Sequence, residues 1–472
     1  MVLPNEDIAE YQTTDTNHAD NFNQRLNKLL ENDNALEDDK VSSDIENIFV
    51  QYAEPNDVVE GDIWFKGFDE YYIYDGEEWQ RHAVDMVQEY GLEWNQSNDE
   101  YQRLDSAEGL DYSGAIGDSS GEIDSDFDYI APWRDMKRCN LADDGTVNAY
   151  YDEPEFKWDG SNGQVMVEIP KFYYKVENDE ENGDNIYRWW VSPYDLEGYE
   201  VHPAFIRDGE EKDYIYFAAF EGWVDTDDKL HSIANKQPTT DEDGNISEDD
   251  GTIVDFRNYA QARGGNWEQR DFLTTSAIQL LYLVEFGDYN SQEIIGRGIV
   301  DKDSGSGNES ENTGDTTVLG NNTGMADGEN GYTSISYRGI ENFWGNIWEW
   351  VDGINIDDYE AYVADHNFVS DKFDEHYNSI GSLLSTSDTF IVDIITNGAS
   401  EDYTFLADEG GGSSSSYLAS NWWIDSGERV ARFGGRWSGD SQAGAFCWAL
   451  NGSSSGSSRR FGARLLYIPE KQ

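Results

Sequence analysis

The sequence predicts an α+β fold in which a twisted antiparallel sheet is combined with two helices. Aromatic-rich runs typical of strands follow one another between residues 132 and 220, for example at Gly163–Lys175. Two stretches between residues 256 and 285 instead repeat apolar residues at helical spacing. Further along, Asn342–Trp350 contains three tryptophans within seven residues. Burial of each such ring is worth about 2–3 kcal/mol, so this segment belongs to a core.

The two helices are expected in succession. The first places Phe256 and Tyr259 on one face and ends before the glycine pair that begins at Gly264. The second begins with Thr274 or Thr275 as its N-cap. It is apolar on most sides, which predicts a buried helix.

Composition limits the possible partners. Lys and Arg number 31 against 97 Asp and Glu, which gives a net charge of −66. This charge repels nucleic acid and anionic lipid, so we expect neither nucleic-acid binding nor membrane insertion. With 16 Trp, 29 Tyr and 21 Phe the chain has material for a core, so the acidity indicates an acidic surface adapted to high salt and a halophilic source.

Two further observations concern the compartment. Cys139 and Cys447 make neither a disulfide framework nor a thiolate metal site, and whether they are bridged stays open. The sequence contains no apolar run of about 18 residues, and it does not begin with the basic and apolar regions of a signal peptide. We therefore expect a protein that is not exported through a cleaved leader.

Three segments near the end of the chain carry a family resemblance. They are Asn342–Trp350, Gly434–Trp437 and Gly462–Arg464, in this order. They resemble the N-x-x-G-N-x-W-E-W, G-G-S-W and G-F-R segments of the formylglycine-generating-enzyme (sulfatase-modifying factor) type of C-type-lectin fold. Arg436 replaces the usual serine and Ala463 the usual aromatic residue. The resemblance implies a C-type-lectin-like C-terminal domain in which the tryptophan motifs meet.

The N-terminal part is similar to attachment regions of viral tail proteins. Apolar residues at helical spacing between Phe22 and Leu30 predict a helix, and Gly61–Phe65 followed by Tyr71–Trp79 predicts hairpins. The expected organisation is a helical attachment segment (1–50), a small β-hairpin module (51–82), an acidic linker or connecting unit (83–130) and the lectin-like domain (131–472), which has insertions near 301–332 and 359–416.

The family resemblance does not extend to catalysis. The positions that hold the two catalytic cysteines of the family are Gly439 and Gly444 here. Cys447, between Phe446 and Trp448, is better interpreted as a small buried hydrophobe. We therefore expect no catalytic residues and no enzyme of this type. Hydrolysis of glycans stays open, because 97 carboxylates cannot be paired from sequence alone.

The resemblance also implies a structural Ca²⁺ ion. Its ligands would be the side chains of Asn342 and Glu349 and the backbone carbonyls of Gly345 and Ile347. Hard oxygen ligands from a turn suit Ca²⁺. In the alternative, Glu349 simply accepts hydrogen bonds from loop amides.

Receptor binding is expected from the ribbon between the second and third motifs. In lectin-like domains this face displays variable side chains, and the mixture here of aromatic rings with polar tips suits sugars or protein surfaces. The candidate residues are Asp440, Gln442, Phe446, Trp448, Asn451 and Arg459. Phe446 and Trp448 are spaced by two, so both could instead point into the core.

Together these features predict a viral tail-fibre adhesin in the virion tail. It would attach the virion to a glycan or S-layer glycoprotein on a halophilic, archaeal host, beside other tail and baseplate proteins, and by resemblance as a homotrimer. One alternative is a structural baseplate or decoration protein that binds no receptor. Another, from a different class, is a glycan-cleaving tail-tip enzyme.

Overall fold

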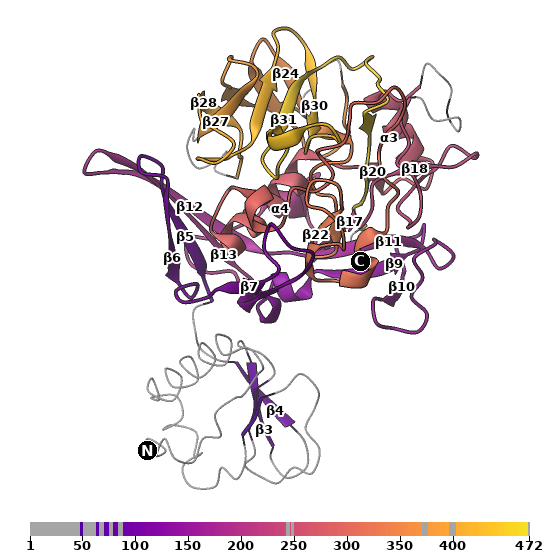
Figure 1. Ribbon diagram of the computed structural model, residues 1–472. Coiled ribbons are helices and arrows are strands. Elements are labelled where there is room, and N and C mark those ends of the chain that lie inside the picture. The colour runs from indigo at the N-terminus through magenta and orange to yellow at the C-terminus, as the bar shows by residue number, and fades with distance from the viewer. Residues whose placement is uncertain are drawn as a thin grey trace.

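The computed structural model describes residues 88–470 except 242–245, 247–249, 371–375 and 396–402, together with the backbone of four short strands before residue 84. This part of the chain is mostly β-sheet with few helices (Figure 1). Among the residues described, no helix is long and apolar enough to cross a membrane. The attachment helix expected within residues 1–50 lies outside them.

The four strands before residue 84 form one sheet in chain order. The first pair is parallel and the other two pairs are antiparallel. The residues that join these strands, in the 51–82 segment, lie outside the described part of the chain. The strands are β1 (Ile48–Val50), β2 (Ile63–Phe65), β3 (Glu70–Tyr74) and β4 (Trp79–Ala83).

Two larger sheets contain most of the strands between residues 90 and 218, and the first of these sheets also includes two strands from later in the chain. The six-stranded sheet contains, in spatial order, β10 (Val147–Tyr150), β9 (Lys137–Leu141), β11 (Gln164–Pro170), β17 (Tyr214–Ala218), β33 (Leu465–Tyr467) and β20 (Trp267–Gln269). The first five-stranded sheet contains β14 (Glu200–Val201), β12 (Tyr173–Glu181), β13 (Asp184–Ser192), β5 (Tyr90–Asn95) and β6 (Glu100–Asp105).

The segment 83–130 is therefore not the linker that the sequence suggested. β5 pairs along its length with β13, because Tyr90, Leu92 and Trp94 alternate along the strand and bury their side chains. The acidic residues around them occupy the other positions of the strands and turns. Residues 88–130 are therefore part of the folded body.

A second five-stranded sheet also includes residues from this segment. It contains β23 (Ile340–Glu341), β22 (Ile335–Tyr337), β21 (Thr323–Met325), β8 (Gly121–Ser125) and β7 (Tyr112–Gly114). β21 lies within the region 301–332, which was expected to be an insertion loop. Buried Met325 and Leu319 show that the end of this region packs into the body.

The largest sheet has nine strands, and each of the three motifs overlaps or directly follows one of them. In spatial order it runs β26 (Asn378–Ser382), β25 (Glu360–Val363), β24 (Trp348–Asp357), β30 (Arg429–Phe433), β31 (Trp448–Gly452), β29 (Asn421–Ile424), β27 (Thr389–Ile394) and β28 (Ala407–Gly410), and β32 (Phe461–Gly462) pairs with β24. The expected insertion 359–416 thus extends this sheet on both sides.

Short elements complete the described chain. They are the strand pairs β15 (Ile206–Arg207) with β16 (Glu210–Glu211) and β18 (Trp223–Val224) with β19 (Leu230–His231), and the 3₁₀ turns η1 (Asp126–Tyr129), η2 (Trp133–Asp135), η3 (Pro203–Phe205), η4 (Asp315–Leu319) and η5 (Asp440–Gln442).

Both expected helices are present, as α3 (Ile253–Gln261) and α4 (Phe272–Phe286), and a third short helix, α5 (Ser291–Ile294), follows. The N-cap of α4 is Asp271, whose side chain accepts from the Thr274 backbone, so the prediction of a threonine cap was wrong. An aspartate is an equally good N-cap, and sequence spacing does not choose between them.

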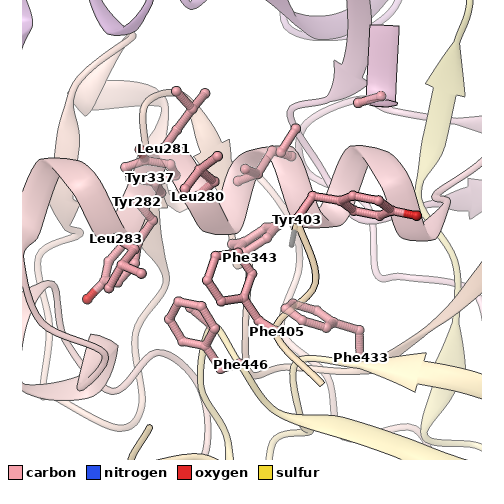
Figure 2. Close-up of a cluster of buried hydrophobic side chains, with 14 of the residues drawn as sticks. Leu280, Leu281, Tyr282, Leu283, Tyr337, Phe343, Tyr403, Phe405, Phe433 and Phe446 are labelled. Atoms are coloured by element: carbon pink, nitrogen blue, oxygen red, sulfur yellow. The ribbon is translucent and has the colours of Figure 1, made fainter. Parts of the chain in front are cut away.

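The helix α4 is buried on every side, as predicted. It lies at the centre of the body and contacts β5 and β13 on one side and β24 on the other (Figure 1). Figure 2 shows Leu280–Leu283 of this helix beside aromatic rings from distant parts of the chain, including Phe405 and Phe446. Cys139 and Cys447 are both buried and free, which answers the open question of a bridge between them.

Candidate functional site

The three motifs meet at the nine-stranded sheet. The Gly345 N–H donates to the Gly434 carbonyl at 3.1 Å, the Trp437 N–H donates to the Asn346 carbonyl at 2.7 Å, and Glu349 of β24 pairs with Gly462 of β32. Segments more than 80 residues apart in the chain are therefore in direct contact, as the resemblance required. The sheet presents two faces here, and they carry different chemistry.

The turn before β24 explains the polar residues of the first motif. Asn342, Gly345 and Asn346 have positive φ values of 49°, 87° and 54°. Glycine and asparagine tolerate this left-handed backbone better than other residues do. A Cβ on Gly345 would lie 3.1 Å from both the N and O of Ile299, so the turn also requires a small residue.

The inner face of the sheet holds a buried ionic triad. Glu349 accepts from Arg270 Nη1 at 2.6 Å and from Arg464 Nε at 2.9 Å. All three side chains are at most 3% exposed. Burial alone would raise the pKa of the Glu349 carboxyl, but Arg464 and Arg270 hold it below its ordinary value. The triad therefore joins β24 to the third motif and to the residue before the N-cap of α4.

A second buried carboxylate, Glu221, lies beside the first motif. Its Oε2 accepts from Asn346 Nδ2 at 2.6 Å and from Asn342 Nδ2 at 3.2 Å. Burial raises the pKa of Glu221 to about 8, although Arg464 opposes the shift. The amide groups of the motif thus point their donors at a carboxylate and stabilise the turn.

This arrangement does not fit the Ca²⁺ ion that the resemblance implied. Both oxygens of Glu349 accept from guanidinium groups, and Asn342 directs its nitrogen to Glu221 while its oxygen accepts from the Ile335 backbone at 3.4 Å. A cation beside Arg270 and Arg464 would meet two positive charges. Gly345 and Ile347 lie in the same turn, but their carbonyls alone do not make a site.

Two of the six expected receptor-binding side chains are buried. Phe446 packs against Tyr289 and Tyr282, with ring centroids 4.7 and 6.0 Å apart (Figure 2). Trp448 packs against Phe433 at 4.8 Å. Both are fully buried and point into the core, which corrects their assignment to the receptor and confirms the alternative.

The other four lie in different environments. Asp440 is exposed and pairs with Arg297 at 2.6 Å, while Gln442 donates to Asp388 at 3.2 Å. Asn451 accepts from Arg432 Nη2 at 2.6 Å. Arg459 donates to the backbone of the 304–307 loop, including Gly305 at 3.1 Å. Each of the four already has a partner within the chain.

The opposite face of the sheet, called the outer face here, carries the side chains of Trp348, Trp350, Trp423, Arg432, Ala449 and Asn451. Trp348, Trp350 and Ala449 are buried beneath other parts of the chain, whereas Trp423 and Asn451 are half-buried. The Trp348 and Trp423 rings are 5.5 Å apart and perpendicular, and Trp423 is half-buried. The Arg432 guanidinium lies 4.0 Å from the ring centre of half-buried Phe461. Arg436, Arg459 and Arg460 stand in the loops beside this face.

Sequence reasoning assigned no role to Arg432, Arg436 or Arg460, although a signal was available. Residues 429–464 contain six arginines and a single acidic residue, Asp440, in a chain whose net charge is −66. Such a local reversal of charge distinguishes this segment from the acidic remainder of the chain.

Comparisons with known proteins do not identify a family for this chain. No protein-family model and no curated protein matches the chain. Among solved structures, it is similar to the P3c, I1 and U1 variants of the Major Tropism Determinant, at 11%, 12% and 11% identity. Each match covers 86–87% of this chain and 82–83% of the other, with a TM-score of 0.26. A TM-score this low establishes no shared fold.

Proposed function

We propose that this protein is a tail-fibre adhesin of a virus that infects a halophilic, archaeal host. The proposal rests mainly on the outer face of the nine-stranded sheet. Half-buried Trp423 and Phe461 lie there beside Arg432 and Asn451, on strands anchored from the inner side by the Glu349 triad. Aromatic rings with polar neighbours on a rigid scaffold are typical of binding surfaces.

The remaining parts of the proposal come from the sequence. The resemblance of the N-terminal region to viral tail proteins favours attachment to the tail, beside baseplate proteins and as a homotrimer. The net charge of −66 favours a medium of high salt, where ions screen repulsion within a few Å. A glycan or S-layer glycoprotein on the cell surface would be the receptor.

The test uses the full chain. Fluorescently labelled protein should bind cells that the virus infects, should not bind resistant cells, and should reduce infection when added first. Binding that does not distinguish the two kinds of cell, together with undiminished infection, would favour the decoration protein. Release of reducing sugar ends from the host surface would favour the glycan-cleaving enzyme.

A further inference from the structure

Buried arginines in this protein generally have a carboxylate partner. Within the described ranges, six arginines that are at most 10% exposed form such pairs. Isolated buried charges are costly, so pairing is the expected arrangement. The pairs are Arg207 with Asp271, Arg257 with Asp352, Arg263 with Asp143, Arg270 and Arg464 with Glu349, and Arg338 with Glu285.

Two buried arginines depart from this rule. Arg138 has no ion pair within the described ranges but donates to the backbone of Gly339 and Thr316 and to the Thr316 hydroxyl. Arg432 has far fewer acceptors. It is 9% exposed, and its only side-chain hydrogen bond to described residues runs from Nη2 to Asn451. Its Nε is buried and has no acceptor in that part of the structure. Around it lie the rings of Phe461 at 4.0 Å, Trp350 at 5.5 Å and Trp348 at 5.8 Å. These rings attract the cation but do not neutralise it.

Arg436 and Arg460 extend the same feature. The Nε atoms of both are buried and lack an acceptor among the described residues. Arg460 lies 6.0 Å from the Trp437 ring and Arg459 lies 5.7 Å from it. The unpaired groups are all N–H donors, so the missing partner is an acceptor.

The charges of these arginines influence one another. Burial, followed by the charge of Arg436, lowers the pKa of Arg432 to about 10. Burial, followed by Arg460, lowers the pKa of Arg436. No described carboxylate contributes to either shift. The positive charge of Arg436 therefore acts on Arg432, and that of Arg460 acts on Arg436, with no carboxylate to offset either.

We propose that Arg432, Arg436 and Arg460 bind the carboxylate or sulfate group of a surface saccharide. This inference rests on the proposed adhesin function and specifies its receptor. A guanidinium presents paired N–H donors that match a carboxylate or sulfate group, and a bound anion would supply the counter-charge that no described carboxylate supplies.

The surroundings of the cluster favour a short anionic saccharide over other anions. Half-buried Trp423 and Phe461 offer aromatic surfaces to sugar rings, and Asn451 and the serine-rich turn 453–458 offer groups that hydrogen-bond hydroxyls. The net charge of −66 repels long polyanions, so one or a few charged sugars fit better than a nucleic acid or an acidic protein.

The test measures binding of short probes to the full chain by calorimetry in one concentrated-salt buffer. Trigalacturonate and sulfated maltotriose separate the two sources of negative charge, and maltotriose serves as the neutral probe. We expect at least one charged saccharide to bind about tenfold or more tightly than maltotriose, as a charged hydrogen bond predicts. Equal binding of the neutral probe, or tighter binding of triglutamate or a dinucleotide, overturns the proposal.

Substitutions of single arginines show where the charged saccharide binds. Arg436→Ser installs the residue of the resembled motif and should fold, and it should weaken binding of the charged saccharide about tenfold. Arg460→Gln should also weaken it. Arg188→Gln removes the same charge from another sheet, where Arg188 pairs with Glu93, Asp179 and Glu181, and should leave the affinity unchanged. Unchanged affinity in both cluster variants would place the binding elsewhere.

Host-cell binding and saccharide binding are measured separately, so failure of the saccharide proposal can be distinguished from failure of the adhesin proposal. If wild-type protein binds host cells but no charged saccharide, the adhesin stands and the saccharide proposal fails. If it binds the saccharide through the cluster but no host cell, the site stands and the adhesin proposal fails.

Discussion

The two faces of the nine-stranded sheet use arginine in opposite ways. On the inner face, Arg270 and Arg464 share Glu349 and are completely buried. On the outer face, Arg432 lies opposite Trp350 on the neighbouring strand and has no carboxylate partner in the described chain. Successive residues of a strand point to opposite faces, so the two environments are one residue apart. An arginine that is paired with a buried carboxylate contributes to the stability of the fold, whereas an arginine without a carboxylate partner can pair with an anionic ligand.

The largest expected effect comes from removing the shared carboxylate. Glu349→Gln leaves Arg270 and Arg464 buried without a counter-charge, and should lower the free energy of unfolding by about 3–5 kcal/mol. Denaturant unfolding measures it. Glu211→Gln, which breaks a half-exposed pair with Lys171, should cost at most about 1 kcal/mol. A loss below 1 kcal/mol in Glu349→Gln would show that the inner network is not important for stability.

A second interior group should make stability depend on pH. His202 is fully buried, and burial followed by Arg207 lowers its pKa to about 3 from 6.5. Between these two pKa values the unfolded chain therefore binds more protons than the folded chain. The contribution of His202 to the free energy of unfolding is complete above pH 6.5 and is lost as the pH falls toward 3. It should amount to a few kcal/mol.

The measurement compares wild type with His202→Asn, because asparagine can still accept from the Ala204 backbone that His202 Nδ1 now caps at 3.2 Å. The difference in unfolding free energy between the two proteins should change between pH 7 and pH 4. A constant difference would contradict the lowered pKa.

A smaller effect is expected from the outer face. Arg432→Met keeps an unbranched side chain against the aromatic rings and removes an unpaired charge, so stability should change by less than about 1 kcal/mol in either direction. Arg270→Met, the matched inner variant, should lose about 3 kcal/mol or more. Equal losses in thermal unfolding would remove the distinction between the faces.

The smallest expected effect is that of calcium. Because Glu349 is held by two arginines, adding Ca²⁺ or a chelator at constant ionic strength should shift the unfolding temperature by less than about 1 °C. Mg²⁺ at the same concentration is the control for ionic strength. A rise specific to Ca²⁺, absent in Glu349→Gln, would restore the metal site.

Sequence reasoning succeeded where local pattern and motif order carry the information. It identified both main helices, the burial of α4 and the meeting of the tryptophan motifs. It failed to see β5, because the acidic residues nearby concealed the alternation of Tyr90, Leu92 and Trp94. It could not decide which way Phe446 and Trp448 point, since strand spacing alone leaves both faces open.

The candidate site was harder to predict for a physical reason. Glu349 is 79 residues from Arg270 and 115 from Arg464 in the chain, so no local pattern reveals the triad. Whether an arginine has a partner depends on packing between distant strands. The local excess of arginine in 429–464 is visible in the sequence, but which of its members are neutralised is visible only in three dimensions.

One strand of the six-stranded sheet has a consequence for biosynthesis. β33, at residues 465–467, lies between β17 and β20 and not at an edge, and Arg464 immediately before it binds the backbone of Ala218 and Glu341. When translation has reached residue 450, β17 and β20 have been synthesised, but the strand that pairs with both of them has not. Folding of the body is therefore completed only after nearly all of these residues have been translated, and premature termination shortly before Arg464 should yield a protease-sensitive product.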